Sequence, residues 1–126
     1  MRAVDTNLLV RLITRDDARQ VAVAESFVSI GAWVGHLVLA ETTWVLSAVY
    51  GRPPAAIAAA VDMLLNHRHL TVQDAEVVGG ALEHFRANPR LDFADCLVLE
   101  TARKAGHLPV GTFDRQLARL EGAQKL

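Results

Sequence analysis

Four carboxylates interrupt apolar stretches of the sequence at positions where a charge is costly. Asp5 and Asp114 each follow a short apolar run that predicts a strand, and Glu41 and Asp95 fall on the apolar faces of two predicted helices. Buried carboxylates that lie close together repel one another and take up protons unless a cation joins them. Because oxygen ligands select hard cations, the pattern predicts a site for one or two Mg²⁺ or Mn²⁺ ions that performs phosphoryl chemistry.

Each acid also has a simpler interpretation. Asp5, Asp92 and Asp114 stand in front of predicted helices, where an aspartate commonly caps the first turn. Glu41 could instead pair with an arginine in the core. What favours the metal site is the joint pattern, with acids at two strand ends and on two helix faces. Thr6 and Asn7, next to Asp5, are then available to orient that carboxylate or the attacking water.

Strand and helix patterns alternate along the chain without a linker or a repeat. This order predicts an α/β fold, a single domain over residues 1–126 with a short central parallel sheet flanked by helices on both faces. Ligands of such sheets gather at the carboxyl ends of the strands. The predicted strands cover residues 2–4, 32–34, 70–72 and 108–112, and the predicted helices cover 6–13, 16–28, 37–50, 55–65, 74–87, 93–105 and 115–120.

Composition limits the class of protein. Hydrophobic residues make up 52% of the 126 residues and charged ones 21%, which is typical of a folded domain and excludes a disordered chain. The longest uncharged apolar run, 55–61, is far shorter than the ~20 residues of a membrane span. Asp5 falls where a signal peptide would be apolar. A single cysteine, Cys96, excludes an internal disulfide and suits a reducing compartment, so we expect a cytoplasmic protein without a membrane segment.

Four stretches together resemble the PIN-domain ribonucleases of the VapC toxin type over nearly the full length of the chain. They are "VDTNLLV" at residues 4–10, "LVLAETTWVL" at 37–46, "FADCLVLETA" at 93–102 and "GTFDRQL" at 111–117. Each stretch alone is a weak signal, but their order and spacing are specific. Domains of this family commonly close with a final edge strand, for which "EGAQKL" at 121–126 offers only a short stretch.

The resemblance implies a metal-dependent endoribonuclease that acts as the toxin of a toxin–antitoxin pair. Its partners would be an RNA substrate, a cognate antitoxin protein and a second copy of the chain in a homodimer. The matching positions would make Asp5, Glu41, Asp95 and Asp114 the catalytic and metal-binding acids. Thr6, Asn7 and Thr112 would support these acids as polar neighbours. Asp92 would assist from outside the set of direct metal ligands.

Basic residues offer a weaker signal for RNA. The chain carries 13 lysines and arginines against 14 acids, so setting the four site acids aside leaves a basic excess. Arg11, Arg15 and Arg19 recur every four residues and would form one basic edge that contacts phosphates. An ordinary solvated surface explains the same spacing.

Two other functions stay open at this stage. One is a different Mg²⁺-dependent phosphoryl hydrolase, against which Asn7 counts because an aspartate nucleophile motif would have a second acid there. The other is a catalytically silent module that binds a protein partner through its acidic pocket. A nuclease assay with and without chelator separates these alternatives.

Remaining features concern packing. Residues 55–65 have no clear polar face, which predicts a homodimer contact at this helix and the one before it, or else a helix buried within the monomer. Trp33 and Trp44 are expected to serve packing. Gly79 and Gly80 lie within a predicted helix and indicate a weak point or a close helix contact.

Overall fold

A computed structural model describes all 126 residues, and its helices and strands follow the predicted order with one exception. The strands are β1 (Arg2–Ala3), β2 (Ala32–Val34), β3 (Leu70–Val72), β4 (Val110–Thr112) and β5 (Ala123–Lys125). The helices are α1 (Thr6–Thr14), α2 (Ala18–Val28), α3 (His36–Ala48), α4 (Pro54–Leu65), α5 (Ala75–Ala87) and α6 (Phe93–Ala105). The exception is the helix predicted at 115–120, of which only one 3₁₀ turn, η1 (Leu117–Arg119), forms. The α/β fold class is thereby confirmed.

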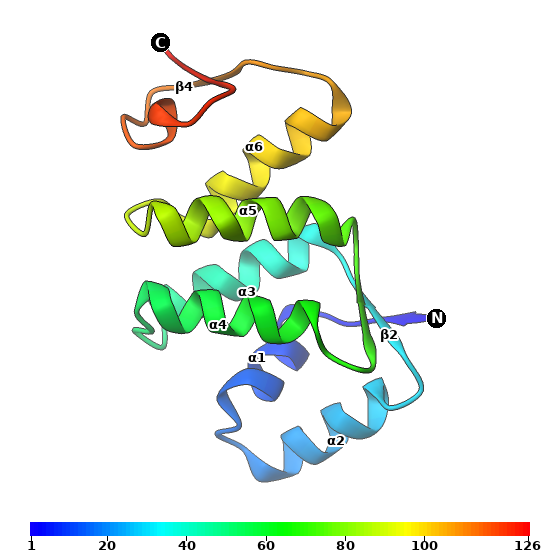
Figure 1. Ribbon diagram of the computed structural model, residues 1–126. Helices are drawn as coiled ribbons and strands as arrows, with labels where there is room; N and C mark the ends of the chain where they lie inside the picture. The colour runs from blue at the N-terminus through cyan, green and yellow to red at the C-terminus, as the bar shows by residue number, and fades with distance from the viewer.

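Five strands divide between two parallel sheets. β1, β2 and β3 form one sheet in that order, with Ala32 of β2 opposite Arg2 on one side and Leu70 on the other. β4 pairs instead with β5, so that the stretch at the end of the chain does complete a strand. In Figure 1 the first sheet lies beside α3 and α4, whereas β4 and β5 lie beyond α6 at the end of the molecule. The strands that precede Asp5 and Asp114 therefore belong to different sheets, contrary to the prediction of one shared sheet edge.

Local signals explain where most helices begin and end. Asp5 and Asp17 cap α1 and α2, each accepting a hydrogen bond at 3.0 Å from the backbone N–H three residues on. Pro54 occupies the first turn of α4, where its missing N–H costs nothing. Gly106 ends α6 with φ +83°, a left-handed conformation that a side chain disfavours. Asp74 precedes α5 but does not cap it, because its carboxylate pairs with Lys104 of α6 at 2.8 Å.

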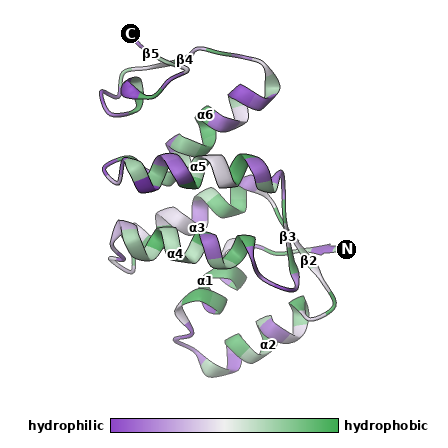
Figure 2. Cartoon of the chain, viewed as in Figure 1, coloured by the Kyte–Doolittle hydropathy of each residue, from purple (hydrophilic) through white to green (hydrophobic).

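The hydrophobic core lies between the first sheet and the helices, with Leu39, Leu46, Val61 and Leu99 almost inaccessible to solvent. Figure 2 shows apolar residues alternating with polar ones along most helices, while the last turns of α6 are hydrophilic. None of the helices is both long and apolar enough to cross a membrane.

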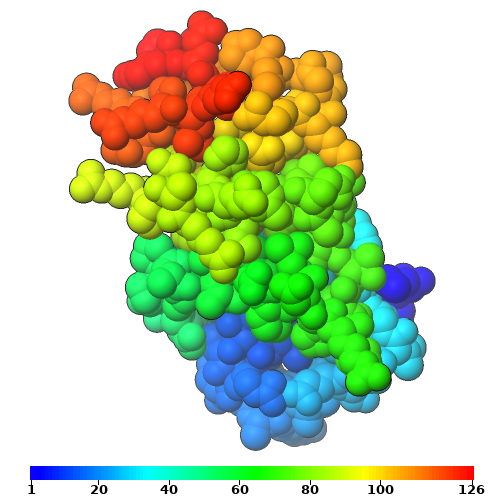
Figure 3. Space-filling model, viewed as in Figure 1, coloured from blue at the N-terminus to red at the C-terminus, as the bar shows by residue number.

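A polar network joins the C-terminal unit, β4–η1–β5, to α6 and α5. Glu100 of α6 accepts hydrogen bonds from Arg103 at 3.3 Å and lies 2.6 Å from His84 Nε2 on α5. Arg103 also donates to the carbonyl oxygen of Glu121, just before β5, at 2.6 Å. Gly80 faces Glu100, whose carboxylate would lie 3.4 Å from an added Cβ, whereas a Cβ at Gly79 would meet nothing within 4 Å. Figure 3 shows the C-terminal residues, in orange and red, resting on the yellow α6.

We expect Arg103→Ala to lower the free energy of unfolding by about 1–2 kcal/mol, since hydrogen bonds to a charged group contribute on this scale. The variant loses the bond to Glu121 and one partner of Glu100, whose side chain is 14% exposed. Urea unfolding at pH 7 measures the change. Arg90→Ala is the matched control, because Arg90 is exposed and makes no ion pair. Equal stability of the two variants would show that the network contributes nothing.

Candidate active site

Asp5 and Glu41 form the first of two acidic groups. Asp5 ends the short connection from β1 to α1, where its carboxylate is exposed and caps the helix through the Leu8 N–H. The Thr6 hydroxyl, one residue on, donates a hydrogen bond to the Glu41 carboxylate of α3. Asn7 is exposed on the same turn of α1. The structure therefore brings Asp5, Thr6, Asn7 and Glu41 to one place, at the carboxyl end of β1.

Glu41 is exposed, and the prediction that it lies on a buried stripe with Val38 and Val45 was wrong. The buried side of α3 consists of Leu39, Thr42, Thr43 and Leu46. Its two threonines tolerate burial because each hydroxyl donates to a backbone carbonyl of the same helix, at 2.7 and 2.9 Å. Glu41 instead lies on the exposed side of α3, where the Thr6 hydroxyl reaches its carboxylate and the charge stays in contact with solvent.

Asp92, Asp95 and Asp114 form the second acidic group. Asp95 lies in the first turn of α6 and is half-buried. Its pKa is raised above the ordinary range, first because burial disfavours the charged form and then because the charges of Asp92 and Asp114 lie nearby. No lysine or arginine pairs with any of the three. The second group thus holds uncompensated negative charge.

Asp114 and Asp92 differ in whether their carboxylates accept hydrogen bonds from the backbone. Asp114 accepts hydrogen bonds from the backbone N–H groups of Gln116 and Leu117 at 2.7 and 2.9 Å, and its own N–H donates to the Thr112 hydroxyl. Thr112 and Asp114 thereby shape the turn after β4. Asp92 precedes α6, yet its carboxylate makes no capping hydrogen bond, so the simple interpretation as a helix cap was wrong for this residue.

The two groups do not merge into one metal site in this conformation. No three histidine, cysteine, aspartate or glutamate side chains are placed to hold a metal ion together. The chemistry of the donors nevertheless fits a hard divalent cation. All four predicted acids carry oxygen ligands without a basic partner, which is the ligand chemistry such a cation prefers.

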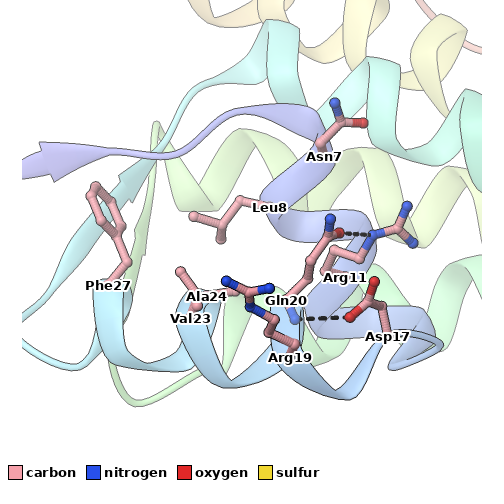
Figure 4. A pocket seen from close by; sticks show the side chains of 9 residues that line it. All are labelled: Asn7, Leu8, Arg11, Asp17, Arg19, Gln20, Val23, Ala24 and Phe27. Carbon is pink, nitrogen blue, oxygen red and sulfur yellow. Dashed lines mark hydrogen bonds between the residues drawn. The ribbon is translucent and has the colours of Figure 1, made fainter.

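The predicted basic edge borders a cavity of about 520 Å³ between α1 and α2, which Asn7 also lines (Figure 4). Arg11 and Arg19 line it, but the Arg11 guanidinium is held by Asp16 and Gln20, each at 2.6 Å. Arg15 pairs with Glu25 at 2.7 Å. Arg19 alone among the three predicted phosphate contacts has no acidic partner. Acidic neighbours thus neutralise much of the charge that the sequence spacing suggested.

Two further residues, Cys96 and Trp44, lie next to the predicted acids in the sequence or on the same helix face. Cys96, beside Asp95, is fully buried, and burial raises the pKa of its thiol to about 12, so it is core packing and not a nucleophile. Trp44 was expected to pack in the core but is 62% exposed. Trp44 follows Glu41 by three residues and lies with it on the outer side of α3.

Comparison with known proteins identifies the family. The PIN domain family model matches residues 2–123, so the chain belongs to the PIN-domain family, as its four motifs predicted, and these domains are nucleases. A search of curated proteins gives no match. Among solved structures, the chain is similar to VapC20 of Mycobacterium tuberculosis, described as a sarcin–ricin loop cleaving toxin. Identity is 22% and the TM-score 0.44, with coverage of 94% of this chain and 93% of that one.

Proposed function

We propose that this protein is a Mg²⁺- or Mn²⁺-dependent endoribonuclease that acts as the toxin of a toxin–antitoxin pair in the cytoplasm. The observation that carries the proposal is the PIN-domain match over residues 2–123, combined with four acids at the matching positions that have no basic partner. In this proposal Asp5, Glu41, Asp95 and Asp114 bind one or two ions. A bound ion supplies an acidified water and positive charge for the departing oxygen.

The protein's own residues have distinct tasks in this scheme. Thr6 holds the Glu41 carboxylate in a fixed orientation, and the exposed amide of Asn7 can donate to a phosphate oxygen or accept from the attacking water. Thr112 fixes the turn that presents Asp114. In-line attack by water with departure of the 3′-oxygen leaves a 5′-phosphate on one product and a 3′-hydroxyl on the other.

Incubation of the purified protein with end-labelled RNA in Mg²⁺ tests the proposal directly. We expect cleavage that stops in excess EDTA and returns when Mg²⁺ or Mn²⁺ is added back. RNA that stays intact under all these conditions would favour the alternative, a catalytically silent PIN domain that binds a protein partner. Release of inorganic phosphate from small phosphoesters without RNA cleavage would favour another phosphoryl hydrolase.

We also propose a homodimer through α4 and the helix before it, with an antitoxin as a further partner. Three large apolar residues of α4 are buried within the monomer, namely Ile57, Val61 and Leu64. They are therefore not available for the homodimer contact that the apolar sequence of this helix predicted. What remains exposed is a narrow stripe of small residues that includes Ala55 and Ala59, beside a shallow groove against α5.

We expect light scattering to give twice the chain mass of 13.7 kDa for the wild type at tens of micromolar. Ala59→Glu should shift the protein toward the monomer, because it places a charge in a desolvated contact. Ala22→Glu, at an exposed alanine of α2, is the matched control. A wild-type monomer would refute the dimer, and a dimeric Ala59→Glu would move the contact away from α4.

A further inference from the structure

A small cavity of about 180 Å³ opens between α3, α4, α5 and the start of α6. Its floor is apolar and buried, and consists of Ile57, Phe85 and Phe93. The two phenylalanine rings meet edge to face with their centroids 5.9 Å apart. Its rim carries Trp44, Ser47 and Asp92. The cavity therefore combines a buried apolar base with an aromatic and polar mouth.

Two of the rim side chains, Trp44 and Asp92, do not contribute to the packing or the ion pairs that stabilise the fold. The Trp44 side chain is 62% exposed, although tryptophan is usually largely buried. Asp92 begins α6 without capping it and forms no ion pair. By contrast Thr43, which also lines the cavity, donates its hydroxyl to the Ala40 carbonyl. An aromatic face and a carboxylate are thus free to bind a ligand.

This cavity adjoins both acidic groups. Trp44 follows Glu41 by three residues on α3, which places the two side chains on the same side of the helix. Asp92 lies close enough to Asp95 for its charge to raise the Asp95 pKa. The rim of the cavity thus belongs to the two elements, α3 and the start of α6, that carry the acids Glu41 and Asp95.

We propose that the cavity binds one unpaired guanine of the RNA substrate, next to the bond that is cut. The inference rests on the proposed endoribonuclease function and adds the substrate feature that this site recognises. The volume corresponds to about six water molecules of ~30 Å³ each, enough for a flat ring but less than the ~300 Å³ at which pockets for whole drug-sized ligands begin.

The rim chemistry selects this base. The exposed Trp44 ring offers a stacking surface of the kind that holds single-stranded bases. The Asp92 carboxylate is an acceptor with two oxygens, and guanine is the RNA base that presents two adjacent N–H donors on one edge, from N1 and the 2-amino group. In a duplex those donors pair with cytosine, so the site requires an unpaired guanine.

Fluorescence titration tests the proposal in a Trp33→Phe background, where Trp44 is the single remaining tryptophan. The probes are an adenine pentanucleotide and the same RNA with one central guanine, in EDTA to prevent cleavage. We expect guanine to quench Trp44 emission and bind about tenfold tighter, within the range of one bidentate base contact. Asp92→Asn should remove this preference, and Trp44→Ala should raise the KM for guanine-containing RNA about tenfold.

Leu37→Ala is the matched control, because Leu37 is 85% exposed on α3, one turn before Glu41, and does not line the cavity. It should keep the KM of the wild type. Equal affinity of the wild type for both RNAs would overturn the guanine site, while chelator-sensitive cleavage would leave the nuclease function standing. A Trp44→Ala variant with unchanged KM but half the mass in light scattering would assign the cavity to a protein contact. Absence of both binding and cleavage would refute the proposed function and the guanine site together.

Discussion

Asp5→Asn is expected to lower the rate of RNA cleavage at least ~100-fold, the scale on which single electrostatic contributors to a transition state act. Asparagine keeps the size of the side chain and can still accept the hydrogen bond from the Leu8 N–H, so the cap of α1 and the fold should persist. What the substitution removes is one negative charge at the carboxyl end of β1. Single-turnover cleavage of labelled RNA in Mg²⁺ measures the effect.

The matched control for this experiment is Asp62→Asn, the same chemical change at an exposed carboxylate of α4 that hydrogen-bonds only to Asn66. It should cleave at the wild-type rate. Circular dichroism of both variants confirms that they are folded. Full activity of purified Asp5→Asn, or undiminished wild-type cleavage in excess EDTA, would exclude the metal-dependent mechanism.

The second large effect concerns stability. Mg²⁺ should raise the melting temperature of the wild type, because an ion that binds only the folded state stabilises it by mass action. At 100 times the Kd the gain is about 2.7 kcal/mol, which corresponds to roughly 10 °C for a domain of this size. In Asp95→Asn the increase should be much smaller. Differential scanning calorimetry with and without Mg²⁺ measures both, and Asp62→Asn should respond as the wild type does. Equal increases in wild type and Asp95→Asn would show that Asp95 is not a ligand.

The pH dependence without metal gives an independent check on Asp95. Since its pKa is raised in the folded protein, the folded state holds this proton more tightly than the unfolded state. The ionised carboxylate therefore destabilises the metal-free fold at neutral pH, and the penalty disappears as pH falls through the raised pKa toward the unfolded value near ~3.9. Asp95→Asn should be at least as stable as wild type at pH 7, with the difference vanishing in acid. A variant that is less stable at pH 7 would contradict the charge repulsion.

Much of the secondary structure follows from local signals in the sequence. Pro54 at the start of α4, Gly106 after α6 and Asp17 before α2 act within one turn of their own position, so their effects can be read without knowing the rest of the fold. The family signal is equally local, because motif order and spacing predicted a PIN domain, and the family match over residues 2–123 confirms it. The assignment of Asp5, Glu41, Asp95 and Asp114 to the site stays a prediction from those motifs.

The tertiary structure decided which side of a helix is buried and which strands pair. α3 is apolar nearly all round, so its sequence alone did not show that Thr42 and Thr43 would turn inward and Glu41 and Trp44 outward. Of the helix predicted at 115–120 only a 3₁₀ turn forms, although the Asp114 carboxylate caps its start. The chain becomes extended at Leu120 and passes through Gly122, with φ +95°, into β5, so the pairing of β5 with β4 ends the helix early.

The pairing of β4 had the largest consequence. A strand's sequence specifies which residues face a core, but the choice of partner depends on segments far away in the chain. β4 pairs with β5, and Arg103 holds this unit against α6, so Asp114 lies with Asp92 and Asp95 while Asp5 lies with Glu41. Local sequence thus supplied the acids that we propose to hold a cation. The placement of Asp114 beside Asp92 and Asp95 depends on the pairing of β4 with β5, a contact between segments for which no single stretch of sequence carries the information.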